Sequence, residues 1–199
     1  MKQAKSELKI AVIGGIGSGK SEAAKYLAEK LSYRYLSADI INRELLSDGR
    51  YLKKLEKAFP EAFRAGVLDT AALSEVVFND GSRRERLNAL AHPEITKRLK
   101  SRLKDKGGAV VEIPLYLESG LRGVFDKVIL ITAEEGVKIS RIAARSKLSE
   151  SEIFARIAAQ KSDAELASYA DTVIDNSAPL AALHAKLSEI SELIKTENN

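Results

Sequence analysis

The chain has 199 residues and contains no cysteine, no tryptophan, one methionine and four prolines. Without cysteine it forms no disulfide, offers no thiolate ligand to zinc and has no cysteine nucleophile. No apolar run approaches the roughly 18 residues that a membrane-spanning helix needs. The apolar stretch at residues 8–13 is too short for a signal-peptide core and runs directly into glycines. These absences indicate a cytoplasmic protein that does not bind a membrane.

The charge is close to balanced, with 32 basic and 28 acidic residues and a net charge of +4. A basic excess suits anionic ligands such as nucleotides. The lysines and arginines are spread among glutamates, which is typical of a solvated surface, and no nucleic-acid-binding motif is present. We therefore expect no nucleic-acid partner, and we expect a monomer or a weak oligomer.

A strand–loop–helix–strand pattern opens the chain and predicts a βαβ unit with a parallel sheet. Residues 8–13 are apolar and predict a buried strand, residues 21–31 have helical apolar spacing, and residues 33–36 predict a second strand. Three more strands are predicted further along, at residues 109–113, 127–132 and 172–174. The length fits one α/β domain built on this sheet.

The segment between the second and third strands reads as mostly helical, with breaks near residues 47–50 and 59–60. Its longest predicted helix, residues 82–106, contains Pro93, which should kink or split it. Three helices are predicted after the third strand, at residues 134–145, 150–160 and 179–195.

A glycine-rich motif lies between the first strand and the first helix. It reads Gly14-Gly15-Ile16-Gly17-Ser18-Gly19-Lys20-Ser21 and fits the phosphate-loop pattern G-x-x-x-x-G-K-[ST]. The glycines bring backbone N–H groups against phosphate oxygens, and the following helix start adds its own N–H groups and dipole. Lys20 can reach the β- and γ-phosphates of ATP, and the Ser21 hydroxyl can bind Mg²⁺. The motif therefore predicts ATP binding by Gly15, Gly17, Ser18, Gly19, Lys20 and Ser21.

Glu22 follows this motif and belongs to the same predicted ATP-binding segment. A carboxylate in the first turn of a helix is favourable without ligand, but it would repel bound phosphates. Two orientations stay open: toward the phosphates, or outward into solvent.

Several further segments make the chain resemble the dephospho-coenzyme A kinases over nearly its whole length. The matching pieces are GGIGSGKS at 14–21, SADIINR at 37–43, AHP at 91–93, EIPLYLE at 112–118, RIAAR at 141–145, RIAAQ at 156–160 and ADTVIDN at 170–176. The resemblance implies a three-layer P-loop kinase fold with a five-stranded parallel sheet. It implies transfer of the γ-phosphoryl group of ATP, with Mg²⁺, to the 3′-hydroxyl of dephospho-coenzyme A. The implied parts are a core (1–39, 108–140 and 166–199), a helical acceptor-binding insertion (40–107) and a lid (141–165).

Asp39 follows the second predicted strand at the carboxyl edge of the sheet, where ligands of open α/β sheets bind. A carboxylate there can accept the proton of an attacking hydroxyl, whereas the alternative is an N-cap for the helix from Ile40 onward. The resemblance implies that Asp39 is the catalytic base and that Arg43 contacts the substrate. The alternative for Arg43 is a solvated surface side chain. Ser37 stands where the family usually has an aspartate, so a negative charge is lost there.

Glu112, near the end of the third predicted strand, is a candidate for orienting Mg²⁺, or else a partly exposed strand residue. The resemblance implies that Pro114, Leu115 and Glu118 line the acceptor pocket, with Tyr116 in place of the family's usual leucine.

Arg141 and Arg145 lie four residues apart and share one helical face. Such a pair can clamp phosphates, and the resemblance implies this catalytic role; surface arginines are the alternative. The family often carries a cation where this chain has Leu166. His92 precedes Pro93 as in the family, and the resemblance implies a role near the substrate with no assigned chemistry; the alternative is packing at a helix kink.

Two other functions remain open from the residues. A related nucleotide or nucleoside kinase would share the phosphate loop. A non-catalytic nucleotide-binding protein would be consistent with Glu22, Ser37 and Leu166.

Overall fold

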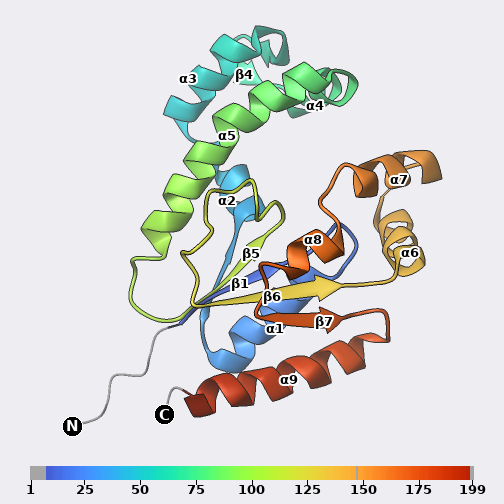
Figure 1. Ribbon diagram of the computed structural model, residues 1–199. Helices are drawn as coiled ribbons and strands as arrows, with labels where there is room; N and C mark the ends of the chain where they lie inside the picture. The colour runs from blue at the N-terminus through green and yellow to red at the C-terminus, as the bar shows by residue number, and fades with distance from the viewer. Residues whose placement is uncertain (1–7, 147, 198–199) are drawn as a thin grey trace. The chain divides into compact units, whose positions relative to one another are not determined.

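The computed structural model describes residues 8–146 and 148–197 and divides into two compact units (Figure 1). One unit combines residues 1–37 with residues 105–199, and the other consists of residues 38–104. The predicted insertion, residues 40–107, begins two residues after the second unit begins and ends three residues after the second unit ends.

The first unit is built on five parallel strands in the order β2-β5-β1-β6-β7. Their bounds are β1 Lys9–Ile13, β2 Arg34–Ser37, β5 Ala109–Ile113, β6 Lys127–Thr132 and β7 Thr172–Asp175. The register pairs Ile13 with Ile113 on one side and with Leu130 on the other, so the carboxyl ends of three strands meet at one edge. The predicted α/β fold with a five-stranded parallel sheet is confirmed.

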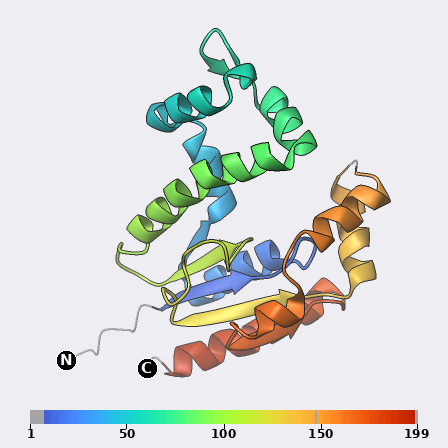
Figure 2. The same cartoon turned by 45° about the horizontal axis from the view of Figure 1, so that its top comes forward.

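Helices α1 (Lys20–Leu31) and α9 (Leu180–Glu197) pack together on one face of this sheet, as Figure 2 shows. Leu27 of α1 and Leu187 of α9 are fully buried in the same apolar cluster as Ile10 and Val12 of β1. Strands covered on both faces read as continuous apolar runs, which is why the sequence predicted them. The remaining helices of this unit are α6 (Glu135–Arg145), α7 (Glu150–Ala158) and α8 (Asp163–Ala167).

The second unit is mainly helical and has its own core, in which Leu45, Leu55 and Phe59 are buried. Its elements are α2 Ala38–Leu45, α3 Gly49–Ala58, the 3₁₀ turn η1 Pro60–Ala62, β3 Phe63–Arg64, β4 Val67–Leu68, α4 Thr70–Asn79 and α5 Gly81–Arg102. Aspartates cap three of the helices: Asp48, Asp69 and Asp80 accept backbone N–H groups at the starts of α3, α4 and α5.

Several local predictions need correction. Pro93 was expected to kink or split the long helix; α5 is continuous through Pro93, so it is not split, and it ends at Arg102 rather than at residue 106. An internal proline costs about 3 kcal/mol, and Ala91 and Leu99 on either side of it are buried. The β3–β4 hairpin and the short helix α8 were not predicted.

Candidate functional site

The phosphate loop connects the end of β1 to the start of α1, which begins at Lys20. Gly14 and Gly19 have φ angles of 149° and 92°. A Cβ on Gly14 would lie 2.4 Å from the carbonyl oxygen of Ile131, and one on Gly19 would lie 2.3 Å from Nδ2 of Asn176. Both positions therefore require glycine on steric and conformational grounds. The N-cap residue of α1 is Gly19, which has no side chain to cap the helix, so this N-terminus is suited to an anion.

Ser21, at the end of this loop, contacts the buried carboxylate of Glu112. The Ser21 hydroxyl donates a hydrogen bond to Oε1 of Glu112, and the Tyr35 hydroxyl donates one to Oε2 at 2.5 Å. Glu112 lies within β5 and is only 3% exposed, so its alternative as a partly exposed strand residue is wrong. Ser37 is also buried, and its Cα is the register partner of Glu112. A hydroxyl and a carboxylate held together are hard oxygen donors of the kind that Mg²⁺ prefers.

Three side chains from the last third of the chain hold the phosphate loop and its neighbours. Oε1 of Gln160 accepts the N–H of Ile16 at 2.7 Å. Nδ2 of Asn176 donates to the carbonyl of Ser18 at 2.8 Å, and Nη2 of Arg141 donates to the carbonyl of Asn176 at 2.9 Å. Arg141 thus lies beside the loop, whereas Arg145, at the end of α6, is exposed. Gln160 and Asn176 belong to segments that carried the family resemblance, yet neither residue was predicted to have a role in the site.

An ion pair that the sequence did not predict also adjoins the loop. Nζ of Lys138 on α6 lies 2.5 Å from Oδ2 of Asp163 on α8, and the lysine side chain is only 12% exposed. A Cβ on Gly15 would lie 3.9 Å from Nζ of Lys138 and 3.8 Å from Oδ1 of Asp163. The pair therefore places one positive and one negative charge next to the phosphate loop.

Buried polar atoms without a hydrogen-bond partner gather around this loop. Among the described residues there are five, and four of them belong to Ser18, Arg141, Asp163 and Asn176. Ser18 lies in the loop, and the other three adjoin it. Buried polar groups normally find partners, so their concentration here indicates a site completed by a polar ligand.

A small pocket joins the phosphate loop to the predicted acceptor segment. Its lining includes Gly14 and Gly15 together with Pro114, Leu115 and Glu118. Leu166, which stands where a cation was expected, is buried and lines the same pocket beside Lys161. Lys161 is paired with Glu165 at 3.3 Å.

Glu22 has a specific partner on α9. Its Oε1 lies 3.0 Å from Nε2 of His184, whose ring stacks on Tyr26 with centroids 4.0 Å apart. The Glu22 side chain is half exposed. The carboxylate of Glu22 therefore contacts α9, the helix that packs against α1.

The remaining predicted residues lie in the second unit, residues 38–104. Asp39 is exposed and lies in the first turn of α2, which begins at Ala38, so it is inside the helix rather than at its N-cap. Nε of Arg43 donates to the carbonyl of Asp39 at 3.4 Å, and the Arg43 side chain is exposed. His92 is half-buried within α5.

No helix in the described parts of the chain is long and apolar enough to span a bilayer.

Comparison with known proteins finds a match to the family model of dephospho-CoA kinase over residues 8–182. A dephospho-CoA kinase from Deinococcus radiodurans is 35% identical over 184 residues, which cover 90% of this chain and 88% of the relative. A crystal structure of a Thermus thermophilus protein is 33% identical, with a TM-score of 0.76 and coverage of 94% and 97% of the two chains. A dephospho-CoA kinase structure from Campylobacter jejuni is 28% identical, with a TM-score of 0.71 and coverage of 96% and 98%.

Proposed function

Because the chain belongs to the dephospho-CoA kinase family, we propose that it transfers the γ-phosphoryl group of ATP to the 3′-hydroxyl group of dephospho-coenzyme A, the last step in coenzyme A synthesis. The observation that carries this function is the phosphate loop with Ser21 bound to buried Glu112. The unpartnered polar atoms around the loop supply the groups that a nucleotide would complete.

The donor half of the site consists of the loop and the cations beside it. Loop N–H groups and the start of α1 receive the phosphates, and Lys20 neutralises charge on the β- and γ-phosphates. Arg141 and Arg145 stabilise the charge that shifts during transfer. Arg141 is held by its hydrogen bond to the carbonyl of Asn176, and Arg145 lies one helical turn further. Residues 141–165 act as the lid that excludes water, a competing acceptor.

Ser21 and Glu112 hold the magnesium ion that accompanies ATP. The ion neutralises phosphate charge when it is bound. Tyr35 fixes Glu112 from the other side, so the carboxylate stays aimed at the Ser21 hydroxyl.

For the acceptor, we propose roles for residues of the second unit and for residues of the segment after β5. The 3′-hydroxyl oxygen forms a bond to the γ-phosphorus while the bond from phosphorus to the β–γ bridging oxygen breaks, and ADP leaves. Asp39 accepts the hydroxyl proton. Arg43, His92, Pro114, Leu115 and Glu118 hold the acceptor.

An acceptor panel with purified protein, ATP and Mg²⁺ tests this function, with ADP release and phosphorylated product both measured. We expect dephospho-coenzyme A to be turned over with a kcat/KM well above that of AMP, CMP or free nucleosides. Equal use of those acceptors would instead assign a related nucleotide kinase. Nucleotide binding without any turnover would assign a non-catalytic binding protein.

A further inference from the structure

The excess positive charge of the chain is confined to one unit. Residues 38–104 contain 14 basic and 10 acidic residues, a balance of +4. The other unit contains 18 of each, a balance of zero. The net charge of +4 therefore belongs to the unit proposed to bind the acceptor.

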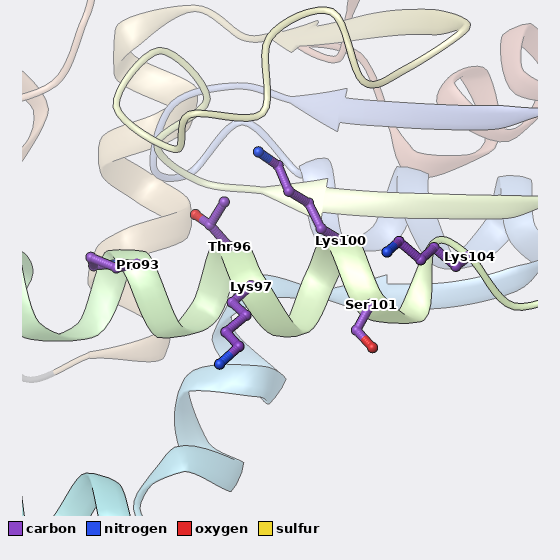
Figure 3. A pocket seen from close by; sticks show the side chains of 6 residues that line it. All are labelled: Pro93, Thr96, Lys97, Lys100, Ser101 and Lys104. Atoms are coloured by element: carbon purple, nitrogen blue, oxygen red, sulfur yellow. The ribbon is translucent and has the colours of Figure 1, made fainter.

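Two adjoining hollows in this unit are lined by more cations than carboxylates. One lies along α5, has a volume of about 480 Å³ and is lined by Pro93, Thr96, Lys97, Lys100, Ser101 and Lys104 (Figure 3). The other, of about 350 Å³, lies between α3 and α5 and includes Arg50, Tyr51, Lys54, Glu94, Lys97 and Arg98. Lys97 and Ser101 line both hollows, so the two form one continuous surface, which we call the cationic groove.

The carboxylates in the groove are already neutralised. Arg98 binds Asp48, and Lys54 binds Glu94 at 2.7 Å. The hydrogen bond from Lys54 holds the pKa of Glu94 below its ordinary value, so this group stays ionised and paired. Four cations remain in surplus: Arg50, Lys97, Lys100 and Lys104 form no ion pair with any of the residues that the structure describes.

The spacing of the three lysines opposes helix stability when nothing is bound. Lys97, Lys100 and Lys104 are separated by three and four residues, the spacing at which like charges on a helix repel each other. The helix dipole favours cations only in the last turn of α5, and Lys97 lies before that turn. Figure 3 shows Lys97 and Lys100 extending to opposite sides of α5, with Lys104 a turn further along. Two exposed lysines outside this unit are paired with glutamates, in Lys161–Glu165 and Lys195–Glu192.

We propose that the cationic groove binds the diphosphate group of the acceptor. This inference rests on the proposed function, in which the acceptor carries a diphosphate on the same ribose that is phosphorylated. The groove begins at Leu45 of α2, six residues and so about 9 Å along the helix from Asp39. Asp39 and the groove belong to the same unit, as a single ribose that carries both a 3′-hydroxyl and a 5′-diphosphate requires. Ammonium and guanidinium groups with no anionic partner are the donors that bind such a group.

Steady-state kinetics of a charge-neutral variant test the inference. Lys97→Gln/Lys100→Gln/Lys104→Gln removes three charges while keeping polar, helix-forming side chains. We expect KM for dephospho-coenzyme A to rise at least ~10-fold, equivalent to about 1.4 kcal/mol, with kcat and KM for ATP nearly unchanged. The matched control is Lys53→Gln/Lys57→Gln/Arg84→Gln, which removes three exposed charges from the same unit outside the groove. An equal rise in KM in both variants would reduce the effect to overall charge and overturn the inference.

A phosphate-free acceptor separates the groove from the rest of the acceptor site. With adenosine as acceptor, the groove variant and the wild type should have the same kcat/KM. A loss of the same size with adenosine would mean that the lysines act on something other than the diphosphate.

Binding of inorganic diphosphate keeps the groove testable even if the proposed function fails. The phosphate loop is first saturated with Mg²⁺ and a non-hydrolysable ATP analogue, and diphosphate is then titrated calorimetrically. We expect binding to wild type and to the control variant, and at least ~10-fold weaker binding to the groove variant. Equal affinities in all three proteins would overturn the inference, whereas inactivity of the wild type toward dephospho-coenzyme A would overturn only the function.

Discussion

The Ser21 hydroxyl donates its hydrogen bond to Glu112, although 91 residues separate them in the chain. The parallel register makes this possible, because β1 and β5 are neighbours and their carboxyl ends coincide. Tyr35 on β2 holds the other oxygen of the same carboxylate. A helix residue, Ser21 of α1, and a strand residue, Tyr35 of β2, thus fix Glu112 beside the phosphate loop.

Glu112→Gln should raise the Mg²⁺ concentration for half-maximal turnover by ~10-fold or more, the range found when groups that orient metal ligands are removed. Glutamine keeps the shape but loses the charge. Turnover measured against Mg²⁺ at saturating ATP gives the result. Tyr35→Phe is the control: it keeps the carboxylate and should have a smaller effect. A magnesium dependence unchanged in Glu112→Gln would remove Glu112 from the metal site.

Asp39→Asn should lower turnover by ~100-fold or more, because the amide cannot accept the hydroxyl proton. ATP affinity should change little, since the role proposed for Asp39 is on the acceptor. Single-turnover rates and ATP binding are measured on the same preparation. Arg43→Gln provides a comparison in which KM for the acceptor rises more than kcat falls. An unchanged rate in Asp39→Asn would exclude Asp39 as the base.

Glu22→Thr should leave the dissociation constant for ATP within about twofold, as expected for an exposed pair. The contact between Glu22 and His184 directs the carboxylate toward α9. Calorimetric titration with an ATP analogue measures the constant. Substantially tighter binding in the variant would show that the carboxylate repels the phosphates in solution.

Lys138→Met should weaken ATP binding by ~10-fold, because it leaves the carboxylate of Asp163 unpaired beside Gly15. Asp163→Asn should weaken binding less, since the remaining charge is positive and attracts phosphate. The double variant should bind ATP better than Lys138→Met alone. These three dissociation constants form a double-mutant cycle. Additive effects would mean that the two side chains do not act as a pair.

Asn176→Ala should lower the free energy of unfolding by about 1–2 kcal/mol, because the buried carbonyl of Ser18 loses its donor. ATP affinity should fall with it, as the loop is no longer held from this side. Urea unfolding with and without ATP analogue measures both. Asn176→Asp is a stricter form of the test, since it places a second acceptor against the same carbonyl. Stability equal to wild type in both variants would contradict this role.

The sheet and the phosphate loop were predictable because their signals are local. Buried parallel strands appear as short apolar runs, and the loop needs glycines at fixed positions. The β3–β4 hairpin was missed because its turn is Ala65-Gly66, with φ angles of 49° and 77°, rather than a strong Asn-Gly signal. Helix α8 did carry a signal, the capping box formed by Ser162 and Glu165.

The surroundings of the loop were not predictable from the residues alone. Gln160 and Asn176 contact backbone atoms 144 and 158 positions away, and no periodicity or spacing encodes such a contact. In the sequence nothing distinguishes Lys138 and Asp163 from other charged residues. Only the fold places the two side chains beside Gly15. The partner of Glu22 was likewise set by packing of α1 on α9.

The phosphate loop lies within the first 21 residues, but Asn176, which holds it, comes 155 residues after Ser21. At a synthesis rate of 5–20 residues per second, roughly 8–30 s separate the two on the ribosome. Over that interval the loop's backbone groups lack the side chains that later hold them. Closing contacts of such long sequence separation is slow in refolding as well. ATP binding should therefore be among the last properties to appear as the chain folds, even though its sequence signature comes first.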